Sequence, residues 1–328
     1  MTAKMTIIGM GKIGTSFGLA LSEHTNQITR VGHDRRPEVA REAAKKGAVD
    51  KTEFNLHSAV EDADIILMAV PVDEVKTLLE LISEDLKEGA VVIDTSPVMV
   101  GVADWARSLI PKGRYFVSMS PTFNAEYIHE TTSGIDAAHA DLFKNSMMVI
   151  TSPPQMDADA IKLASDLCAL VGSSPFFADP HEFDGLSAAS RMLPKLAAAA
   201  LLNSTTGQAG WVEGRKIAGY EYFTSTEPIF HLDEAKVLGQ ASILNRENTM
   251  RVIDDFIASL EDIREALENR DEERLSQLIH NALEKRELWL SQRRSANWEK
   301  RSDAPKVPSA SENMRRMLTG SLFDRKKK

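Results

Sequence analysis

Apolar residues in the first half of the chain form short runs that alternate with longer segments of helical period. The runs are rich in Val, Ile and Met, which is typical of buried β-strands. They span residues 5–10, 28–34, 63–70, 90–96, 115–120 and 146–152. Between them, residues 35–47 and 71–86 have helical spacing, and Pro37 and Gly47 suit a first helical turn and a helix end. This alternation predicts an α/β domain with a doubly wound, Rossmann-type parallel sheet.

The pattern changes from about Pro180, where strand signals vanish and long helical segments take over at 183–203, 235–270 and 272–294. This predicts an all-α second domain. Apolar residues in the second of these segments recur at i, i+3 and i+4 spacing, which is the mark of a buried helix face. They are Val252, Ile253, Phe256, Ile257, Leu260, Ile263 and Leu267. Because long helices of this kind often pack against a second copy of the chain, we expect a homodimer formed through the helical domain.

These changes predict three regions. Residues 1–179 are expected to form the Rossmann domain, residues 180–298 the all-helical dimerisation and substrate domain, and residues 299–328 a tail. From Lys300 to Lys328 the tail holds nine basic and three acidic residues, a net charge of +6. Such a charged segment is expected to be disordered or a weakly helical contact segment.

Composition narrows the class of protein. A chain of 328 residues with 43% hydrophobic residues can bury a core but exceeds one compact domain. Its formal charge of −9 argues against a nucleic-acid surface, and its single cysteine, Cys168, excludes an intramolecular disulfide. No apolar run approaches the roughly 20 residues of a membrane span, and the N-terminus has no signal segment. We therefore expect a cytoplasmic protein that binds neither nucleic acid nor membrane.

The opening stretch "TIIGMGKIGTSFGLAL" places Gly9, Gly11 and Gly14 between a predicted strand and a predicted helix. Gly9 permits the tight turn, Gly11 leaves room for a pyrophosphate, and Gly14 lets the helix pack closely on the strand. The phosphates would meet the positive end of the helix dipole. Lys12 and Ile13 lie in this turn, and with the three glycines they are predicted to bind a dinucleotide.

Asp34 ends the next predicted strand, 20 residues after Gly14. A carboxylate there accepts hydrogen bonds from the adenosine ribose and repels a 2′-phosphate, which favours NAD. Arg35 and Arg36 follow directly, and either guanidinium could pair with that phosphate, so the cofactor is predicted to be NAD or NADP, with NAD slightly favoured. Val70 and Pro71, at the carboxyl end of another predicted strand, are expected beside the cofactor.

Six segments together resemble the prephenate/arogenate dehydrogenases of tyrosine biosynthesis, in order over roughly residues 5 to 290. They read "IIGMGKIGTSFGLAL", "DIILMAVPVDEV", "VVIDTSPV", "LFKNSMMVITSP", "ADPHEFDGLSAASRMLPKLAAAAL" and "NRENTMRVIDDFIASLEDIREALE". The glycine motif is shared by many dehydrogenases. The "ADP–x–E–x–D" turn into an "S–x–x–L–P" helix, followed by the "N–R–E–N" helix, is more specific.

The resemblance implies an enzyme that oxidises a ring hydroxyl of a cyclohexadienol carboxylate, passes hydride to the nicotinamide and releases CO2. Family members usually supply a proton acceptor as the histidine of an "H–P–M–A–G" segment. This chain reads "SMSPTFNAE", so the matching position is Ser120. Serine does not act as a base near pH 7 without an activating partner.

Other positions of the substrate site also depart from the family pattern. The "S–H–L–P–H" motif appears as "SRMLPK", with Arg191 and Lys195 in place of the histidines. The "D–x–G–S–V–K" loop reads "DTSPVMVG", which keeps Asp94 and a nearby Ser96 but has Met99 where the lysine stands. The "G–F–x–D–x–T–R" segment, whose arginine holds the substrate carboxylate, corresponds to "GYEYFTSTEP", without arginine.

The candidate catalytic residues are Ser96, Ser120, Arg191 and Lys195, and no metal site is predicted. Arg191 and Lys195 lie four apart on one helix face, where they would form a cationic patch suited to a small-molecule carboxylate substrate. Lys195 would alternatively exchange a proton with the reacting oxygen if desolvation lowers its pKa. His129 and His139 are alternative bases, although loop histidines are more often solvated.

Two other functions stay open. One is a β-hydroxyacid-type or imine-type reductase acting on another carboxylated substrate, with Lys195 and Asn203 at the reacting centre. These two residues lie eight apart, whereas that class places them about one helical turn apart. The other is a cofactor-binding protein without catalysis.

Overall fold

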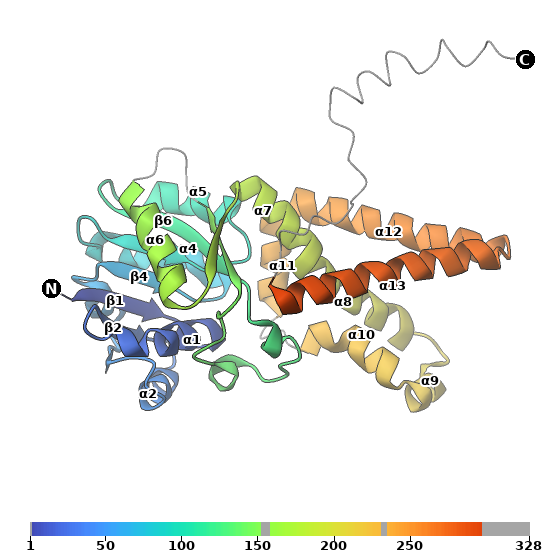
Figure 1. The fold of residues 1–328 in the computed structure, drawn as a ribbon, viewed down its shortest axis with the longest axis horizontal. Coiled ribbons are helices and arrows are strands. Elements are labelled where there is room, and N and C mark those ends of the chain that lie inside the picture. The colour runs from blue at the N-terminus through green and yellow to red at the C-terminus, as the bar shows by residue number, and fades with distance from the viewer. Residues whose placement is uncertain (1, 152–157, 231–234, 297–328) are drawn as a thin grey trace, which may run out of the picture. The chain divides into compact units, whose positions relative to one another are not determined.

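The computed structural model describes residues 2–151, 158–230 and 235–296 (Figure 1). The predicted basic tail, residues 299–328, lies outside the described residues. Contacts divide the chain into two compact units, Met1–Leu278 and Ile279–Lys328. In the part of the chain that the structure describes, no helix combines the length and apolar character that crossing a membrane requires.

An eight-stranded sheet forms the first half of the larger unit (Figure 1). Its strands are β1 (Ala3–Ile8), β2 (Ile28–His33), β3 (Lys51–Thr52), β4 (Ile65–Met68), β5 (Val91–Asp94), β6 (Tyr115–Pro121), β7 (Met147–Thr151) and β8 (Ser174–Phe177). They lie in the order β3-β2-β1-β4-β5-β6-β7-β8. The first six of these strands in chain order pair in parallel, so their carboxyl ends share one edge of the sheet.

Helices bury both faces of this sheet. They are α1 (Lys12–Ala20), α2 (Pro37–Lys45), α3 (Leu56–Val60), α4 (Val72–Ile82), α5 (Val100–Leu109) and α6 (Ala158–Leu170). Ile7 of β1 points into an apolar cluster shared with α1, α2 and α6, whereas Ile8 points into a second cluster shared with α3, α4 and α5. Burial on both faces explains why the strands read as continuous apolar runs. The predicted doubly wound sheet is confirmed.

The last two strands differ from the predicted all-parallel sheet. β7 pairs antiparallel with β6, and β8 pairs parallel with β7. Residues 122–146 join β6 to β7 without an α-helix, and an antiparallel neighbour needs no helical crossover.

The second half is helical, as predicted. It contains α7 (Pro180–Ser187), a π-helical turn η5 (Ala188–Met192), α8 (Leu193–Thr206), α9 (Trp211–Ile217), α10 (Tyr220–Phe230), α11 (Ala235–Leu244), α12 (Arg246–Glu268) and α13 (Glu272–Ser295). The helix predicted over 235–270 is two helices, because Asn245 interrupts it with φ −108° and ψ 38°. Its buried side-chain amide donates to the Asp184 carbonyl at 2.6 Å. This long-range contact fixes the break.

The predicted apolar stripe of α12 is buried only in part. Val252 is 4% exposed, but Leu260 is 50% and Leu267 59% exposed. The prediction that the whole stripe forms a buried face is therefore wrong within one described chain. α12 packs on α7, η5, α8 and α11, and these neighbours leave the residues toward its C-terminal end uncovered.

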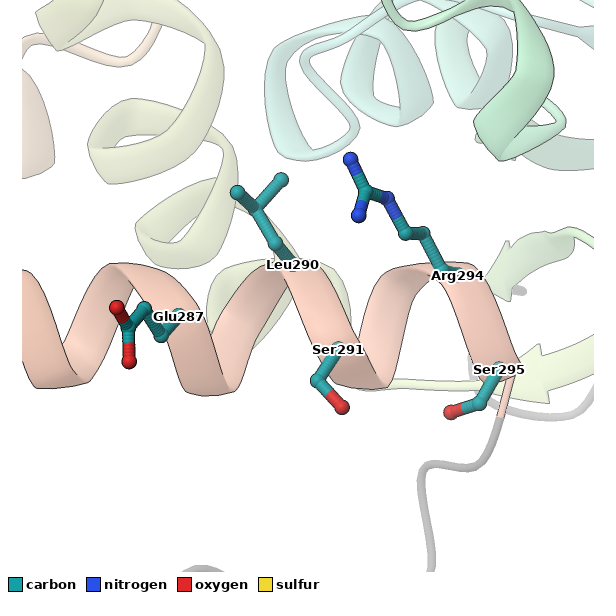
Figure 2. A pocket seen from close by; sticks show the side chains of 5 residues that line it. All are labelled: Glu287, Leu290, Ser291, Arg294 and Ser295. Carbon is teal, nitrogen blue, oxygen red and sulfur yellow. The ribbon is translucent and has the colours of Figure 1, made fainter.

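The described part of the smaller unit is the stretch of α13 from Ile279. An open pocket runs along one side of this helix (Figure 2). It is lined by Glu287, Leu290, Ser291, Arg294 and Ser295, which follow the i, i+3, i+4 spacing of a single helix face. Large apolar side chains of the same stretch are exposed, among them Ile279, Leu283, Leu288 and Trp289.

Candidate active site

The glycine loop between β1 and α1 has the geometry of a dinucleotide cradle. Gly9 has φ +90°, and a Cβ there would lie 2.4 Å from the Ala69 carbonyl oxygen. A Cβ at Gly14 would lie 1.9 Å from the Gly9 carbonyl oxygen. At Gly11, by contrast, a Cβ would meet no described atom within 4 Å. Gly9 and Gly14 are therefore required for close packing, whereas Gly11 keeps a space open for a ligand.

The first turn of α1 faces that space. Gly11 caps the helix and, as a glycine, has no side chain to accept from the first backbone N–H groups. The first backbone N–H groups of an α-helix lack intrahelical acceptors, so those of Lys12 and Ile13 suit a phosphate. This donor set and the open side of Gly11 fit a dinucleotide pyrophosphate.

Asp34 lies where the sequence predicts it, at the end of β2 beside the glycine loop. Its Oδ2 accepts from the Met10 backbone N–H at 2.8 Å and its Oδ1 from that of Arg36 at 2.9 Å. The side chain is only 10% exposed. Each carboxylate oxygen has a further lone pair, so Asp34 can hold the loop and still accept from a ribose hydroxyl. Arg35 pairs with Glu74 of α4.

Val70 and Pro71 border the same loop. The Val70 Cγ1 atom lies 3.0 Å from the Cβ position of Gly9, and Pro71 caps α4 with φ −56°. The structure thus places Asp34 and Val70, two of the residues predicted to bind the cofactor, against the glycine loop.

Lys12 connects this space to the long loop after β6. Its ammonium group lies 4.9 Å from the centroid of the Phe123 ring. Burial lowers the pKa of Lys12, and the Glu130 carboxylate opposes this shift. The loop of residues 122–146 therefore lies against the start of α1.

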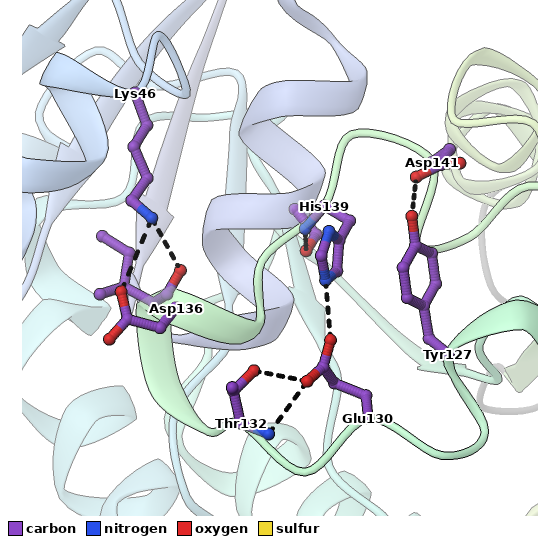
Figure 3. A network of polar contacts seen from close by, with 9 residues as sticks. Lys46, Tyr127, Glu130, Thr132, Asp136, His139 and Asp141 are labelled. Atoms are coloured by element: carbon purple, nitrogen blue, oxygen red, sulfur yellow. Dashed lines mark hydrogen bonds and ion pairs between the residues drawn. The ribbon is translucent and has the colours of Figure 1, made fainter.

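A polar network holds that loop (Figure 3). Glu130 accepts hydrogen bonds from the backbone N–H and hydroxyl of Thr132, at 3.0 and 2.7 Å, and contacts His139 Nε2 at 3.1 Å. The bonds from Thr132, with a smaller contribution from His139, lower the pKa of Glu130 to about 2. The backbone N–H of His139 donates to the buried Ser16 hydroxyl of α1 at 3.0 Å, which fastens the loop to the glycine-loop helix.

The His139 ring is engaged on its other side as well. It stacks on Tyr127, with 4.1 Å between the ring centroids. The Tyr127 hydroxyl donates to Asp141 at 2.5 Å, and this bond raises the pKa of Tyr127 to about 12. Of the two alternative bases, His139 is thus held within the loop, and His129 is exposed.

Ser120 and Arg191, which are 71 residues apart in sequence, meet at the carboxyl end of β6. Arg191 Nη1 donates to Ser120 Oγ at 2.7 Å, and Nη2 donates to the Pro121 carbonyl at 2.9 Å. The guanidinium also lies 5.6 Å from the Phe183 ring centroid. Ser120 is fully buried and Arg191 half-buried. The Ser120 oxygen accepts a charge-assisted hydrogen bond from Arg191 and so fixes the position of the guanidinium.

Arg191 lies within the π-helical turn. The turn spans Ala188–Met192 and directly precedes α8. A π turn accommodates one extra residue within a helix. Lys195 follows one turn later, half-buried in α8.

Ser96 lies at the end of the neighbouring strand, bound to Asp94. Its hydroxyl donates to Asp94 Oδ1 at 2.9 Å and its backbone N–H to Oδ2 at 3.1 Å. Both residues are buried, and burial raises the pKa of Asp94 to about 7. Met99, which stands where the family has lysine, is fully buried beside Phe183.

Asp184 is a residue that sequence reasoning missed. Its carboxylate accepts from the backbone N–H groups of Met99 and Val100, at 2.7 and 3.1 Å, and so caps α5 from the helical half. Burial raises the pKa of Asp184. The sequence contains a signal for this role. Asp184 ends the "ADP–x–E–x–D" motif, and its partner Asn245 begins the "N–R–E–N" motif.

The sheet, the open glycine cradle and the acid after β2 define a nicotinamide-dependent oxidoreductase. Comparisons with known proteins agree. The model of the family described as prephenate dehydrogenase, nucleotide-binding domain, matches residues 17–175. The predicted resemblance to the prephenate/arogenate dehydrogenase family is confirmed.

Relatives extend the similarity into the helical half. The chain is 25% identical over 296 residues to prephenate dehydrogenase of Bacillus subtilis, covering 88% of this chain and 76% of that protein. It is 24% identical over 280 residues to cyclohexadienyl dehydrogenase of Zymomonas mobilis, covering 81% and 89%. A crystal structure of A. aeolicus prephenate dehydrogenase, in complex with hydroxyphenyl propionate and NAD+, superposes with a TM-score of 0.76 at 22% identity, covering 87% of this chain and 98% of that one. This last likeness supports the fold.

Proposed function

We propose that this chain oxidises a cyclohexadienol carboxylate of the prephenate or arogenate kind, in tyrosine biosynthesis, with NAD(P) as hydride acceptor. One observation carries the proposal. The open cradle at Gly11 follows β1, and the Arg191 guanidinium is held at the end of β6 by Ser120 and Pro121. The carboxyl ends of these two strands share one edge of the sheet. Ligands of open α/β sheets bind along this edge.

The glycine-loop residues would hold the cofactor, with Asp34 on its ribose and Val70 and Pro71 beside it. The nicotinamide, when bound, supplies the hydride acceptor. The loop of residues 122–146, tied to α1 through Ser16, would shield the pyrophosphate from water.

Arg191 and Lys195 would bind the substrate carboxylate. Arg191 is held by Ser120 and Pro121, so its guanidinium pays little orientational entropy when it binds an anion. Guanidinium and ammonium groups are hydrogen-bond donors only, which matches a carboxylate.

The proton of the substrate hydroxyl needs another acceptor than Ser120. Ser120 is buried, and its oxygen already accepts from a permanent cation, so it is suited to positioning Arg191. Lys195 is the candidate acceptor, because it is half-buried on the same helical stretch. Ser96, whose hydroxyl proton is engaged by Asp94, can accept a hydrogen bond from the ligand.

We also propose that a second copy of the chain covers the exposed stripe of α12, since Ile257, Leu260 and Leu267 are each about half exposed or more. Uncovered apolar stripes of this length are typical of interfaces. Sedimentation of the wild type as a dimer, and of Leu260→Asp as a folded monomer, is the expected result. A monomeric wild type would contradict this proposal.

The main experiment measures binding of NAD+ and NADP+ by calorimetry, and then turnover of prephenate and of arogenate by nicotinamide absorbance. Turnover of either substrate is expected. Tight cofactor binding with no turnover of either would contradict the proposed reaction and favour a cofactor-binding role.

A further inference from the structure

We propose that Glu74 determines the choice between the two cofactors. Its ion pair with Arg35 withholds that guanidinium from a 2′-phosphate, so the site takes NAD and rejects NADP. This inference rests on the proposed function only for the presence of a dinucleotide site.

The ion pair spans the cofactor edge of the sheet. Arg35 follows the end of β2, and Glu74 lies in the first turn of α4, just after β4. β1 lies between these two strands, and the glycine loop follows it. The pair therefore joins the two sides of the glycine loop, in the region where the adenosine ribose of a Rossmann cofactor lies.

The charges next to this ion pair also favour NAD over NADP. Asp34 offers carboxylate oxygens that are already oriented by two backbone N–H groups, on a side chain that is only 10% exposed. The Arg36 Nε atom lies 4.0 Å from Asp34 Oδ1. Each of the two arginines that could bind a phosphate thus faces a carboxylate, Arg35 facing Glu74 and Arg36 facing Asp34. A 2′-hydroxyl would donate to Asp34, whereas a 2′-phosphate would have to displace a carboxylate from an arginine.

The pair is poorly suited to stabilising the fold. The side chains of Arg35 and Glu74 are 63% and 32% exposed, and exposed ion pairs contribute little to stability. Removing either side chain's charge should leave the protein folded. The effect on cofactor choice can therefore be measured without an effect on structure.

The test is calorimetric titration of NAD+ and NADP+ into the wild type, Glu74→Gln, Arg35→Gln and the double variant. In Glu74→Gln the Kd of NADP+ should fall roughly fivefold, the scale of one exposed ion pair, while the Kd of NAD+ stays within about twofold. The gain should disappear in the double variant, because it depends on the Arg35 guanidinium.

Glu80→Gln is the matched control. Glu80 lies on the same helix and is 49% exposed, with its carboxylate 3.9 Å from Lys76 Nζ. This variant has the same change of net charge and should leave both Kd values unchanged.

Three results would overturn the inference. They are an unchanged ratio of the two Kd values in Glu74→Gln, a gain that persists in the double variant, and a wild type that prefers NADP+. None of these contradicts the proposed function. A wild type that binds neither dinucleotide would overturn both.

Discussion

The glycine loop and the surroundings of Ser120 lie along one edge of the sheet but depend on different kinds of constraint. The glycine loop depends on the backbone, because Gly9 and Gly14 leave no room for a side chain and helix α1 presents its N–H groups. The surroundings of Ser120 depend on side chains from distant parts of the chain, with Arg191 reaching across from the helical half. The glycine loop keeps the pattern of dinucleotide-binding proteins, whereas Ser120, Met99 and Arg191 stand at positions where the chain departs from the family that it resembles. Backbone geometry restricts substitution, and a pocket built from side chains can change its chemistry on the same fold.

Gly11→Val would test the backbone half of this comparison, with the largest expected effect. A Cβ at Gly11 meets no described atom within 4 Å, so the protein should fold and melt as the wild type does. The added side chain would fill the space of the pyrophosphate, and NAD(P) affinity should fall by roughly two orders of magnitude or more. Fluorescence titration measures this. Unchanged affinity in the folded variant would mean that the loop does not hold a dinucleotide.

Gly14→Ala is the contrasting control. Its Cβ would lie 1.9 Å from a backbone oxygen, so this variant should lose stability as well as binding.

Lys195→Met would test the side-chain half. If Lys195 accepts the substrate proton, kcat should fall by on the order of 10², and NAD(P) binding should be unaffected. If it only holds the carboxylate, KM should rise more than kcat falls. Steady-state kinetics separates the two roles. If kcat and KM of the variant equal those of the wild type, Lys195 is not part of the substrate site.

Asp34→Ala has the smallest expected effect. Asp34 combines both kinds of constraint, because its side chain holds the backbone of the glycine loop. NAD should lose roughly tenfold in affinity, because the ribose hydroxyls lose a charged acceptor, and NADP should lose less, because the variant also removes a repulsive carboxylate. Calorimetry with both cofactors measures the difference. Equal losses would show that Asp34 acts only by holding Met10 and Arg36.

The fold could be predicted where periodicity is strong. The six apolar runs are all strands, but the pattern does not predict β3 and β8. β3 has only two residues, and β8, Ser174–Phe177, is exposed throughout and shows no alternation. The break at Asn245 was missed because a helix-compatible sequence is interrupted by a hydrogen bond to the distant Asp184. The helix propensity of a local segment gives no information on contacts with distant residues.

The same limit applies to the site. The glycines, Asp34 and Val70 could be placed because they adjoin the strands that position them. The contact between Arg191 and Ser120 could not, since it depends on the path of a helix 71 residues further along the chain. The ion pair of Glu74 with Arg35 is likewise not predictable, because nothing in the sequence pairs these two residues.

The π turn at Ala188–Met192 has a consequence for how such a pocket changes over evolutionary time. One residue rotates an α-helix by about 100°, so an insertion in a regular helix would turn all following side chains away from their partners. A π turn absorbs that rotation within a few residues. The π turn can therefore present Arg191 to Ser120 without turning the rest of α8. Deleting Ser190 should reverse this and swing Arg191 away from Ser120, an altered geometry that a crystal structure of the variant would reveal.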